Sequence, residues 1–344
     1  MSSGISAAPC ARTVRVVFSD SREYELTVSP GETVLEAAAR LGVPVRSECQ
    51  LGTCGTCKAK CLVGTFDLET EDGLTTMERR RGWALTCVMR PLTDCVLEFP
   101  YPGVSRPATV GQTMHGTIIR LEMVCNTVCR LLVDLGAGSF DFAPGQYVNI
   151  EVPGSGVARS YSMANAPGAA RFAEFFIRLL PTGVMSDYLR STAREGQEVR
   201  LRGPFGSFFL RKARSSMLMV AGGTGLAPML SILQHLVDIG ETHQPIVLLF
   251  GANSTSDLFC LERLKQLQAR FDTLIQQSIV LHASTGWTDE VGHVTALLRS
   301  EHVGRGDLDA YVCGPPPMIE AAIAWLVRHG VPEANIFAEK FLPS

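Results

Sequence analysis

The feature that most constrains this chain is a set of closely spaced cysteines near its N-terminus. Cys49, Cys54 and Cys57 follow the pattern C-x4-C-x2-C, and Cys87 stands 30 residues after the third of them. A short loop with this spacing brings several thiolates to a single centre, which is a metal-ligand arrangement. Gly52 and Gly55 lie between the cysteines, and glycine permits both a positive φ and a close approach of backbone N–H groups to sulfur. The pattern predicts a loop wrapped around a metal centre.

The spacing also indicates the kind of metal centre. A C-x4-C-x2-C loop with one distant cysteine is typical of plant-type [2Fe–2S] sites. Structural zinc, the alternative, usually needs two short C-x2-C pairs, and this chain has only one. Residues 1–100 contain no histidine, which excludes a Rieske-type centre in that segment. We therefore predict a [2Fe–2S] cluster bound by Cys49, Cys54, Cys57 and Cys87.

Six other cysteines lack this context. The chain has 11 cysteines in all, and an odd number in a chain without a visible secretory signal argues against a disulfide framework. Buried thiols pack as small hydrophobic side chains. We expect that role for Cys10, Cys61, Cys95, Cys125, Cys129 and Cys260.

The length and charge of the chain exclude several classes of protein. At 344 residues the chain exceeds the size of one hydrophobic core, which favours two or three domains. Its net charge of −3 gives no general attraction to nucleic acid or anionic membranes. No apolar run reaches the roughly 18 residues of a membrane span, and the N-terminus lacks the basic start and apolar stretch of a signal peptide. We expect a cytoplasmic protein that binds neither nucleic acid nor membrane.

Residues 11–100 predict a first, small domain that carries the cysteine loop. The alternating pattern over residues 13–28, broken at Ser19–Ser21, predicts a hairpin. Residues 33–41 predict an amphipathic helix, and residues 95–99 predict a further strand. Pro- and Gly-containing residues 101–110 then predict a linker.

Residues 111–213 predict a second domain of a different kind. Short strands interrupted by Gly and Pro favour an antiparallel barrel with one helix at 184–191. Residues 101–213 carry 12 basic and 8 acidic side chains, and all but one of the basic ones are arginine. Arginine suits bidentate phosphate contacts, although ordinary surface variation also explains the excess. The expected strands are 113–122, 128–134, 146–152, 159–163, 172–179 and 197–202.

Residues 214–344 predict a third domain in which strands and helices alternate. This order is typical of a parallel, doubly wound α/β sheet. The expected strands are 217–221, 246–251, 278–283 and 309–313. The expected helices are one that ends near 239 and those at 258–270, 292–300 and 316–329.

The barrel segment contains a motif with a clear chemical use. Arg159-Ser160-Tyr161-Ser162 lies on an expected strand, and it is followed by Gly183-Val184-Met185-Ser186 at a helix start and by Gly203-Pro204-Phe205-Gly206. Arg159 and the N-terminus of the 184–191 helix can both neutralise a pyrophosphate. Together these motifs resemble the FAD domain of the ferredoxin–NADP reductase superfamily. The resemblance implies that Tyr161 packs on the isoalloxazine and that Ser162 hydrogen-bonds near N5. A surface Arg159 and a core Tyr161 are the alternative.

Two motifs in the third segment indicate a nucleotide. Strand 217–221 leads into Gly222-Gly223-Thr224-Gly225-Leu226-Ala227-Pro228, a phosphate-binding turn by position. Pro228 replaces the last glycine of G-x-G-x-x-G, and the turn is similar to the GGTG-x-AP turn of the same superfamily. Strand 309–313 ends in Cys313-Gly314-Pro315-Pro316-Pro317-Met318. The resemblance places Cys313 beside the nicotinamide, and no nearby histidine would activate it as a nucleophile.

The end of the chain completes this prediction. The resemblance places Phe341 on the face of the isoalloxazine, where an aromatic ring can stack, and Glu339 near Cys313 and Ser162. The alternative is a C-terminal strand with Phe341 in a core. Ser162, Cys313, Glu339 and Phe341 are therefore the predicted catalytic set.

The choice of nucleotide depends on residues 251–262. Discriminating for NADPH needs a cation for the 2′-phosphate, and this stretch contains none. Asp257 would repel that phosphate or accept a hydrogen bond from a ribose hydroxyl. We therefore predict a preference for NADH, with Gly251, Asn253 and Asp257 at the nucleotide.

The whole chain resembles the reductase component of bacterial ring-hydroxylating dioxygenases of the benzoate and anthranilate type. The resemblance implies a β-grasp-like ferredoxin, an FAD barrel and an NAD domain in one chain. It implies electron flow from NADH to FAD, then to the [2Fe–2S] cluster, then to a terminal oxygenase with Rieske and non-haem iron centres. The alternatives are the reductase of a soluble di-iron monooxygenase of the phenol or methane type, and a redox-responsive sensor. A sensor would need an output element such as a helix-turn-helix, and the sequence shows none. We expect a monomer, since an electron carrier docks on its partners in turn.

Overall fold

A computed structural model of the chain describes residues 10–103, 112–136, 140–168, 171–211, 216–304 and 307–341. The chain divides into two compact units, Met1–Val110 and Gly111–Ser344. Most of the predicted linker, residues 104–110, lies outside the described residues. Within the described residues, no helix is both long and apolar enough to cross a membrane.

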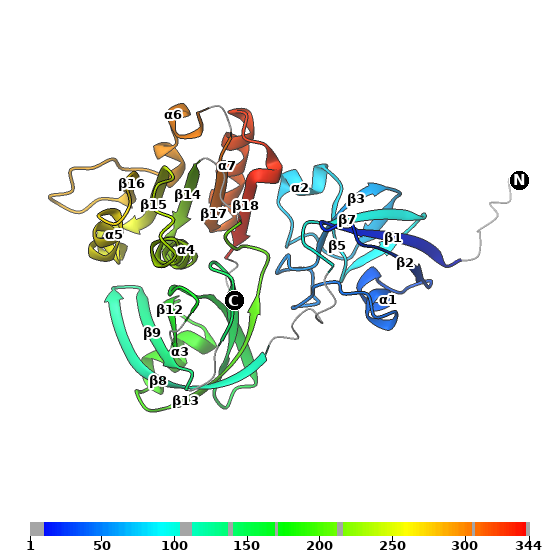
Figure 1. Cartoon of the computed structure of the whole chain (residues 1–344). Helices are drawn as coiled ribbons and strands as arrows, with labels where there is room; N and C mark the ends of the chain where they lie inside the picture. The colour runs from blue at the N-terminus through cyan, green and yellow to red at the C-terminus, as the bar shows by residue number, and fades with distance from the viewer. Residues whose placement is uncertain are drawn as a thin grey trace, which may run out of the picture. The chain divides into compact units, whose positions relative to one another are not determined.

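The N-terminal unit is built on a five-stranded sheet with the order β2-β1-β7-β3-β5 (Figure 1). β1 and β2 form an antiparallel hairpin, and β7 runs parallel to β1. The elements of the unit are β1 (Arg12–Phe18), β2 (Glu23–Val28), α1 (Val34–Arg40), β3 (Lys58–Val63), β4 (Phe66–Leu68), α2 (Thr76–Arg80), β5 (Trp83–Leu85), β6 (Met89–Pro91) and β7 (Cys95–Phe99). This is the α+β arrangement expected of a ferredoxin-like domain.

Local sequence explains these elements. Val14 and Val16 on β1 are fully buried and Arg15 between them is exposed, so one face of the strand builds the core. Thr33 begins α1 with a capping box: its hydroxyl accepts from the Glu36 N–H at 3.2 Å, and its own N–H donates to the Glu36 carboxylate at 2.8 Å. The predicted hairpin, helix and strand 95–99 are confirmed.

The first half of the C-terminal unit is a curved antiparallel sheet with the order β11-β10-β13-β8-β9-β12. Its inward residues, such as Ile118, Val148 and Leu201, form one apolar core. In the described residues the end strands β11 and β12 share no ladder, so the sheet is an open barrel. Its elements are β8 (Gln112–Cys125), β9 (Val128–Asp134), β10 (Tyr147–Val152), β11 (Val157–Ser162), β12 (Phe172–Arg178), α3 (Val184–Ser191) and β13 (Glu198–Phe205).

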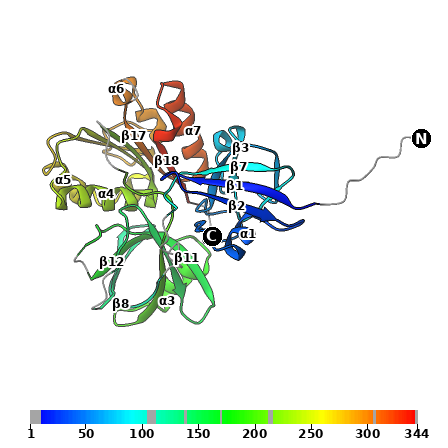
Figure 2. The same ribbon diagram turned by 45° about the vertical axis from the view of Figure 1, so that its right-hand side comes forward.

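The second half of this unit is a five-stranded sheet with the order β16-β15-β14-β17-β18, in which every strand pair is parallel. Helices α4 and α5 cover one face, and α6 and α7 lie on the other (Figures 1 and 2). The predicted doubly wound sheet is therefore present. Its elements are β14 (Met217–Gly222), α4 (Leu226–Asp238), β15 (Ile246–Ser254), α5 (Leu261–Gln268), β16 (Leu274–His282), α6 (Ser300–Val303), β17 (Asp309–Gly314), α7 (Pro316–Arg328) and β18 (Ile336–Lys340).

One predicted helix is wrong. Residues 292–300 form a 3₁₀ turn at Val294–Leu297, and the short α6 follows it. Val294, Leu297 and Leu298 are buried at a spacing that a helix would also give. The backbone is extended at Leu298 and Arg299, so the turn ends there instead of continuing as an α-helix.

Candidate functional site

The structure brings the four predicted cluster cysteines together. Cys57 Sγ lies 3.3 Å from Cys87 Sγ. Contacts with the thiols of Cys54 and Cys87 lower the pKa of Cys49, so Cys49 lies beside both. The backbone N–H groups of Leu51 and Cys54 point at Cys49 Sγ, at 3.4 and 3.5 Å. Four sulfur donors with N–H groups aimed at them are the donor set that a [2Fe–2S] cluster requires.

The glycines of this loop are required by its geometry. Gly52 and Gly55 have φ of 72° and 69°, which side chains rarely adopt. A Cβ at Gly52 would lie 2.6 Å from Thr70 Cγ2, and one at Gly55 would lie 2.7 Å from Lys58 Cε. The backbone conformation of the loop therefore favours glycine at both positions.

An ion pair lies directly after the cysteine loop. Lys58 follows the predicted ligand Cys57, and its Nζ lies 2.8 Å from Glu78 Oε1. Glu78 also accepts from the Thr75 N–H at 2.7 Å in the capping box of α2. Burial opposes ionisation of Glu78, but Lys58 and Thr75 hold its pKa below the usual value.

Replacing Glu78 with glutamine is expected to lower the free energy of unfolding of this unit by about 2 kcal/mol at neutral pH, since a half-buried charged hydrogen bond is lost. A carboxyl with a depressed pKa stabilises the fold above its unfolded value, which is 4.5, and that contribution disappears as the pH falls through the folded pKa. Denaturant titrations at several pH values measure this. Glu71→Gln, which breaks an exposed pair with Arg79, is the control and should cost less than about 1 kcal/mol. Equal losses for the two variants would contradict the prediction.

In the C-terminal unit, three predicted catalytic residues meet although they lie far apart in sequence. Ser162 ends β11 and is 5% exposed, and its hydroxyl donates to Glu339 Oε2 at 3.0 Å. Glu339 on β18 stands opposite Cys313 on β17. Cys313 is fully buried, and burial together with Glu339 raises the pKa of its thiol well above the usual value. A thiol that stays protonated agrees with a positioning role for Cys313 rather than a nucleophilic one.

The rest of the flavin motif lies along β11 and at the start of α3. Arg159 donates to its neighbour's carbonyl, that of Ala158, at 3.0 Å, and among the described residues it forms no ion pair. Tyr161 is half-buried against the barrel core, and burial raises the pKa of its phenol. Ser160 donates to Asn149 Oδ1 at 2.7 Å. An arginine without a carboxylate partner is available for an anionic ligand.

The start of α3 also leaves backbone donors available. No side chain caps the helix at Gly183, which has a φ of 151°. The Ser186 hydroxyl instead accepts from the Leu180 N–H at 2.9 Å. Val184 is 40% exposed, while Met185 is buried. The uncapped N–H groups fit the predicted pyrophosphate.

The glycine-rich turn after β14 has two kinds of glycine. A Cβ at Gly222 would lie 2.6 Å from Met318 Sδ, and one at Gly225 would collide with the Cys313 carbonyl. These two glycines let the ends of β14 and β17 pack together. Gly223 has a φ of 54° and open space where a Cβ would stand. The turn thus keeps one backbone position with open space beside it ahead of Thr224 and α4, whose first turn contains the buried Pro228.

The C-terminal residues close this edge of the sheet. The Phe341 N–H donates to the Gly314 carbonyl at 2.9 Å. The Phe341 ring is half-buried and packs against the core of the parallel sheet. Phe341, Gly314 and the following Pro315 therefore lie at the carboxyl ends of β17 and β18, beside the glycine turn of β14.

The predicted nucleotide-selecting residues lie at the end of β15. Gly251 pairs with Gly222 across the strands, and Asn253 is exposed. Asp257 accepts from Thr127 Oγ1 at 2.6 Å and from Ser254 Oγ at 2.7 Å. Burial opposes its ionisation, but these hydrogen bonds lower the pKa of Asp257. Sequence reasoning missed the contact with Thr127, because nothing local links residues 130 positions apart.

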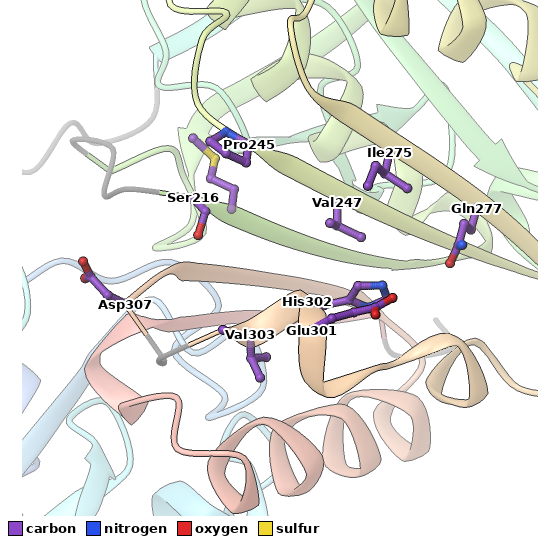
Figure 3. Close-up of a pocket in the computed structure, with 11 residues that line it drawn as sticks. Ser216, Pro245, Val247, Ile275, Gln277, Glu301, His302, Val303 and Asp307 are labelled. Atoms are coloured by element: carbon purple, nitrogen blue, oxygen red, sulfur yellow. The ribbon is translucent and has the colours of Figure 1, made fainter.

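A cavity of about 670 Å³ lies at the amino ends of the parallel strands (Figure 3). In Figure 3, His302 and Glu301 of α6 lie on one side and Val247 and Ile275 on the other. Val247 and Ile275 stand at the amino ends of β15 and β16. Because the glycine turn lies at the carboxyl ends, this cavity is separate from the predicted nucleotide site.

Three family models match successive parts of the chain. Family models for a 2Fe-2S iron-sulfur cluster binding domain, an oxidoreductase FAD-binding domain and an oxidoreductase NAD-binding domain match residues 17–92, 115–210 and 219–323. The 2-halobenzoate 1,2-dioxygenase electron transfer component of Burkholderia cepacia is 34% identical, over 96% of this chain and 98% of that protein. The chain belongs to the family of these electron transfer components.

Two further relatives of this reductase family extend the comparison. The anthranilate 1,2-dioxygenase electron transfer component of Acinetobacter baylyi is 34% identical over 96% of this chain and 98% of that protein. The crystal structure of the Amycolatopsis cytochrome P450 reductase GcoB has a TM-score of 0.71 and 30% identity, and the match covers 96% of this chain and 99% of that one. The chain is thus an oxidoreductase with FAD, NAD and [2Fe–2S] domains, and it carries electrons from NADH through FAD to the cluster.

Proposed function

We propose that this reductase serves an aromatic-ring-hydroxylating dioxygenase and delivers electrons to a terminal oxygenase with Rieske and non-haem iron centres. The observation that carries the proposal is the match over almost the whole length to components named for 2-halobenzoate, anthranilate and toluate 1,2-dioxygenases. The aromatic substrate would belong to the oxygenase and not to this chain. The same role fits a monomer in the cytoplasm, where NADH and the oxygenase are available.

We assign specific roles to the residues at the carboxyl ends of the parallel strands and to those of the flavin motif in the barrel. Bound FAD would supply a carrier that accepts a hydride and releases electrons singly. Ser162, Cys313 and Glu339 would shape the place where nicotinamide meets the flavin, because they meet there from three strands. Arg159 and the uncapped start of α3 would hold the pyrophosphate. Phe341 would cover the flavin until the nicotinamide replaces it.

An anaerobic experiment tests the proposal. NADH should bleach the absorbance of flavin and cluster in the full-length protein, and a purified Rieske-type oxygenase should then be reduced in repeated turnovers. Reduction of flavin and cluster with no transfer to any protein acceptor would favour a sensor and contradict the proposal. Size-exclusion chromatography checks the expected monomer.

A di-iron monooxygenase partner is the second candidate. The electron transfer component of xylene/toluene monooxygenase from Pseudomonas putida is 32% identical over 98% of this chain, and the propane 2-monooxygenase reductase component of Mycolicibacterium goodii is 30% identical over 93%. Faster transfer to a di-iron hydroxylase than to a Rieske oxygenase would favour this candidate.

The protein should use NADH at least about 100-fold better than NADPH, measured as kcat/KM, because a 2′-phosphate near Asp257 meets a like charge. Residues 251–262 contain no Lys or Arg, and the next cation, Arg263, is bound to Glu174 at 2.7 Å. Asn253→Arg should narrow the preference, with Asn253→Gln as the control. Comparable kcat/KM values for the two nucleotides in the unmodified protein would contradict the prediction.

A further inference from the structure

A buried carboxylate joins the two sheets of the C-terminal unit. The side chain of Glu174, on β12, is only 6% exposed. It accepts from Arg130 Nε on β9 at 2.6 Å and from Arg263 Nη1 on α5 at 2.7 Å. A buried charge is tolerated only when it is paired and hydrogen-bonded. Glu174 is therefore neutralised by Arg130 of the barrel and by Arg263 of α5, a helix of the parallel-sheet half.

Arg263 also binds the backbone just after β11, the strand that carries the predicted flavin motif. Its Nη2 donates to the Ala164 carbonyl at 3.1 Å. Ala164 stands two residues after Ser162, and its N–H donates to the Glu174 carbonyl at 2.8 Å. One guanidinium thus binds the Glu174 side chain and the backbone beside Ser162 at the same time, a forked geometry that lysine cannot reproduce.

Helix α4 makes a similar contact with the same stretch of backbone. Ser231 on α4 is fully buried, and its hydroxyl donates to the Asn165 carbonyl at 2.7 Å. Asn165 Oδ1 in turn accepts from the Glu174 N–H at 2.9 Å. Residues 164–165 are therefore fixed to β12 and, through Arg263 and Ser231, to α5 and α4.

The contact between Arg263 and Glu174 lies far from the contact between Ser162 and Glu339. α5 connects β15 and β16, at one side of the order β16-β15-β14-β17-β18, whereas Glu339 lies on β18 at the opposite edge. The barrel and the parallel-sheet half are also joined by Ser162–Glu339, Thr127–Asp257 and Ser231–Asn165, at 3.0, 2.6 and 2.7 Å. Arg263 adds an ion pair to these contacts, and the same guanidinium binds the backbone two residues after Ser162.

We propose that Arg263, together with Glu174, is a positioning residue that fixes the NAD domain at the orientation required for hydride transfer to FAD. The inference rests on that transfer and not on the identity of the terminal acceptor. Hydride transfer requires the reacting atoms to be aligned at close contact, so a small change in orientation lowers the rate more than it lowers nucleotide affinity. Arg130 has a second partner, Glu122, at 2.9 Å, and would still neutralise Glu174 if Arg263 were replaced.

Stopped-flow reduction of the FAD-loaded, full-length protein by NADH tests the proposal. Arg263→Gln should lower the limiting rate of flavin reduction by about 10- to 100-fold, with less than a threefold change in the apparent Kd for NADH. Arg263→Lys keeps the charge and loses the fork, so its rate should be intermediate. Lys265→Gln is the control, because Lys265 lies on the same helix, is 72% exposed and, among the residues that the structure describes, pairs with the exposed Glu262 alone.

A second measurement separates positioning from a purely structural role. Hydrogen–deuterium exchange should increase in peptides that cover residues 163–166 and α5 in Arg263→Gln, and not in Lys265→Gln. A folded, FAD-loaded Arg263→Gln variant with an unchanged limiting rate would overturn the proposal, even if its thermal stability fell. If Arg263→Gln does not fold, Arg263→Lys decides: a normal limiting rate there overturns the proposal in the same way.

Discussion

Replacing Cys57 with serine is expected to abolish electron transfer beyond the flavin while NADH still reduces the flavin at its normal rate. Cys57 is 2% exposed, and its Sγ lies 3.3 Å from Cys87 Sγ. A serine oxygen is a harder and shorter donor than a thiolate, so the loop would lose one of the four ligands that a [2Fe–2S] cluster needs. The iron content, the cluster absorbance and the reduction of cytochrome c should be lost together. NADH-dependent ferricyanide reduction, which takes electrons from the flavin, should remain.

A second cysteine of the same unit provides the matched control. Cys61 lies on β3, four residues after Cys57, and its thiol donates to the Val63 carbonyl at 3.2 Å. Cys61→Ser should therefore keep the cluster and the cytochrome c activity. Loss of the cluster in Cys61→Ser, or its retention in Cys57→Ser, would contradict the ligand assignment.

Features of this fold that depend on local signals could be predicted from the sequence. The helix predicted at 184–191 has those bounds in α3, because Gly183 precedes it and its buried residues recur at helical spacing. The cysteine loop could be predicted because ligand spacing is itself local. The hairpin followed from the alternating pattern, and the parallel sheet followed from the alternation of strands and helices along the chain.

Features that depend on distant contacts could not be predicted in this way. Glu174 and Arg263 lie 89 positions apart, and neither stands in a motif. The approach of Glu339 to Ser162, across 177 positions, was implied by a family resemblance and not by periodicity. The expected helix at 292–300 failed for the same reason, since the burial of Val294 against Gly251 is a tertiary contact.

At the glycine turn, the sequence motif and the structure give partly different reasons for the same glycines. The G-x-G-x-x-G rule assigns its glycines to a tight turn, to the approach of the backbone to the phosphate and to helix–strand packing. In the structure, Gly222 and Gly225 are needed because Met318 and the Cys313 carbonyl approach them, and only Gly223 has open space. Part of the motif is therefore required by packing between β14 and β17.

Ser162→Ala is expected to lower the limiting rate of flavin reduction by NADH about 100-fold, the usual effect of removing one hydrogen-bond donor at a reacting centre. Ser162 is buried, and its hydroxyl bonds Glu339, which stands opposite Cys313. The substitution removes the only side-chain polar atom that β11 contributes to this meeting point and leaves the methylene in place. Alanine creates no large cavity, so FAD content and thermal stability should change little. Anaerobic stopped-flow absorbance measures the rate.

The matched control for this change lies in the turn that leads into the same strand. Ser155, between β10 and β11, is exposed and donates to the Val152 carbonyl at 2.8 Å, so Ser155→Ala should reduce flavin at the normal rate. Glu339→Gln distinguishes two explanations of a slow Ser162→Ala variant, because glutamine keeps an acceptor for the Ser162 hydroxyl and removes the charge. If the hydroxyl acts directly on the flavin, Glu339→Gln should be much faster than Ser162→Ala. If Ser162 acts only by holding the Glu339 carboxylate, both variants should be equally slow. A normal rate in Ser162→Ala would contradict both explanations and leave hydride transfer dependent on the orientation of the two domains alone.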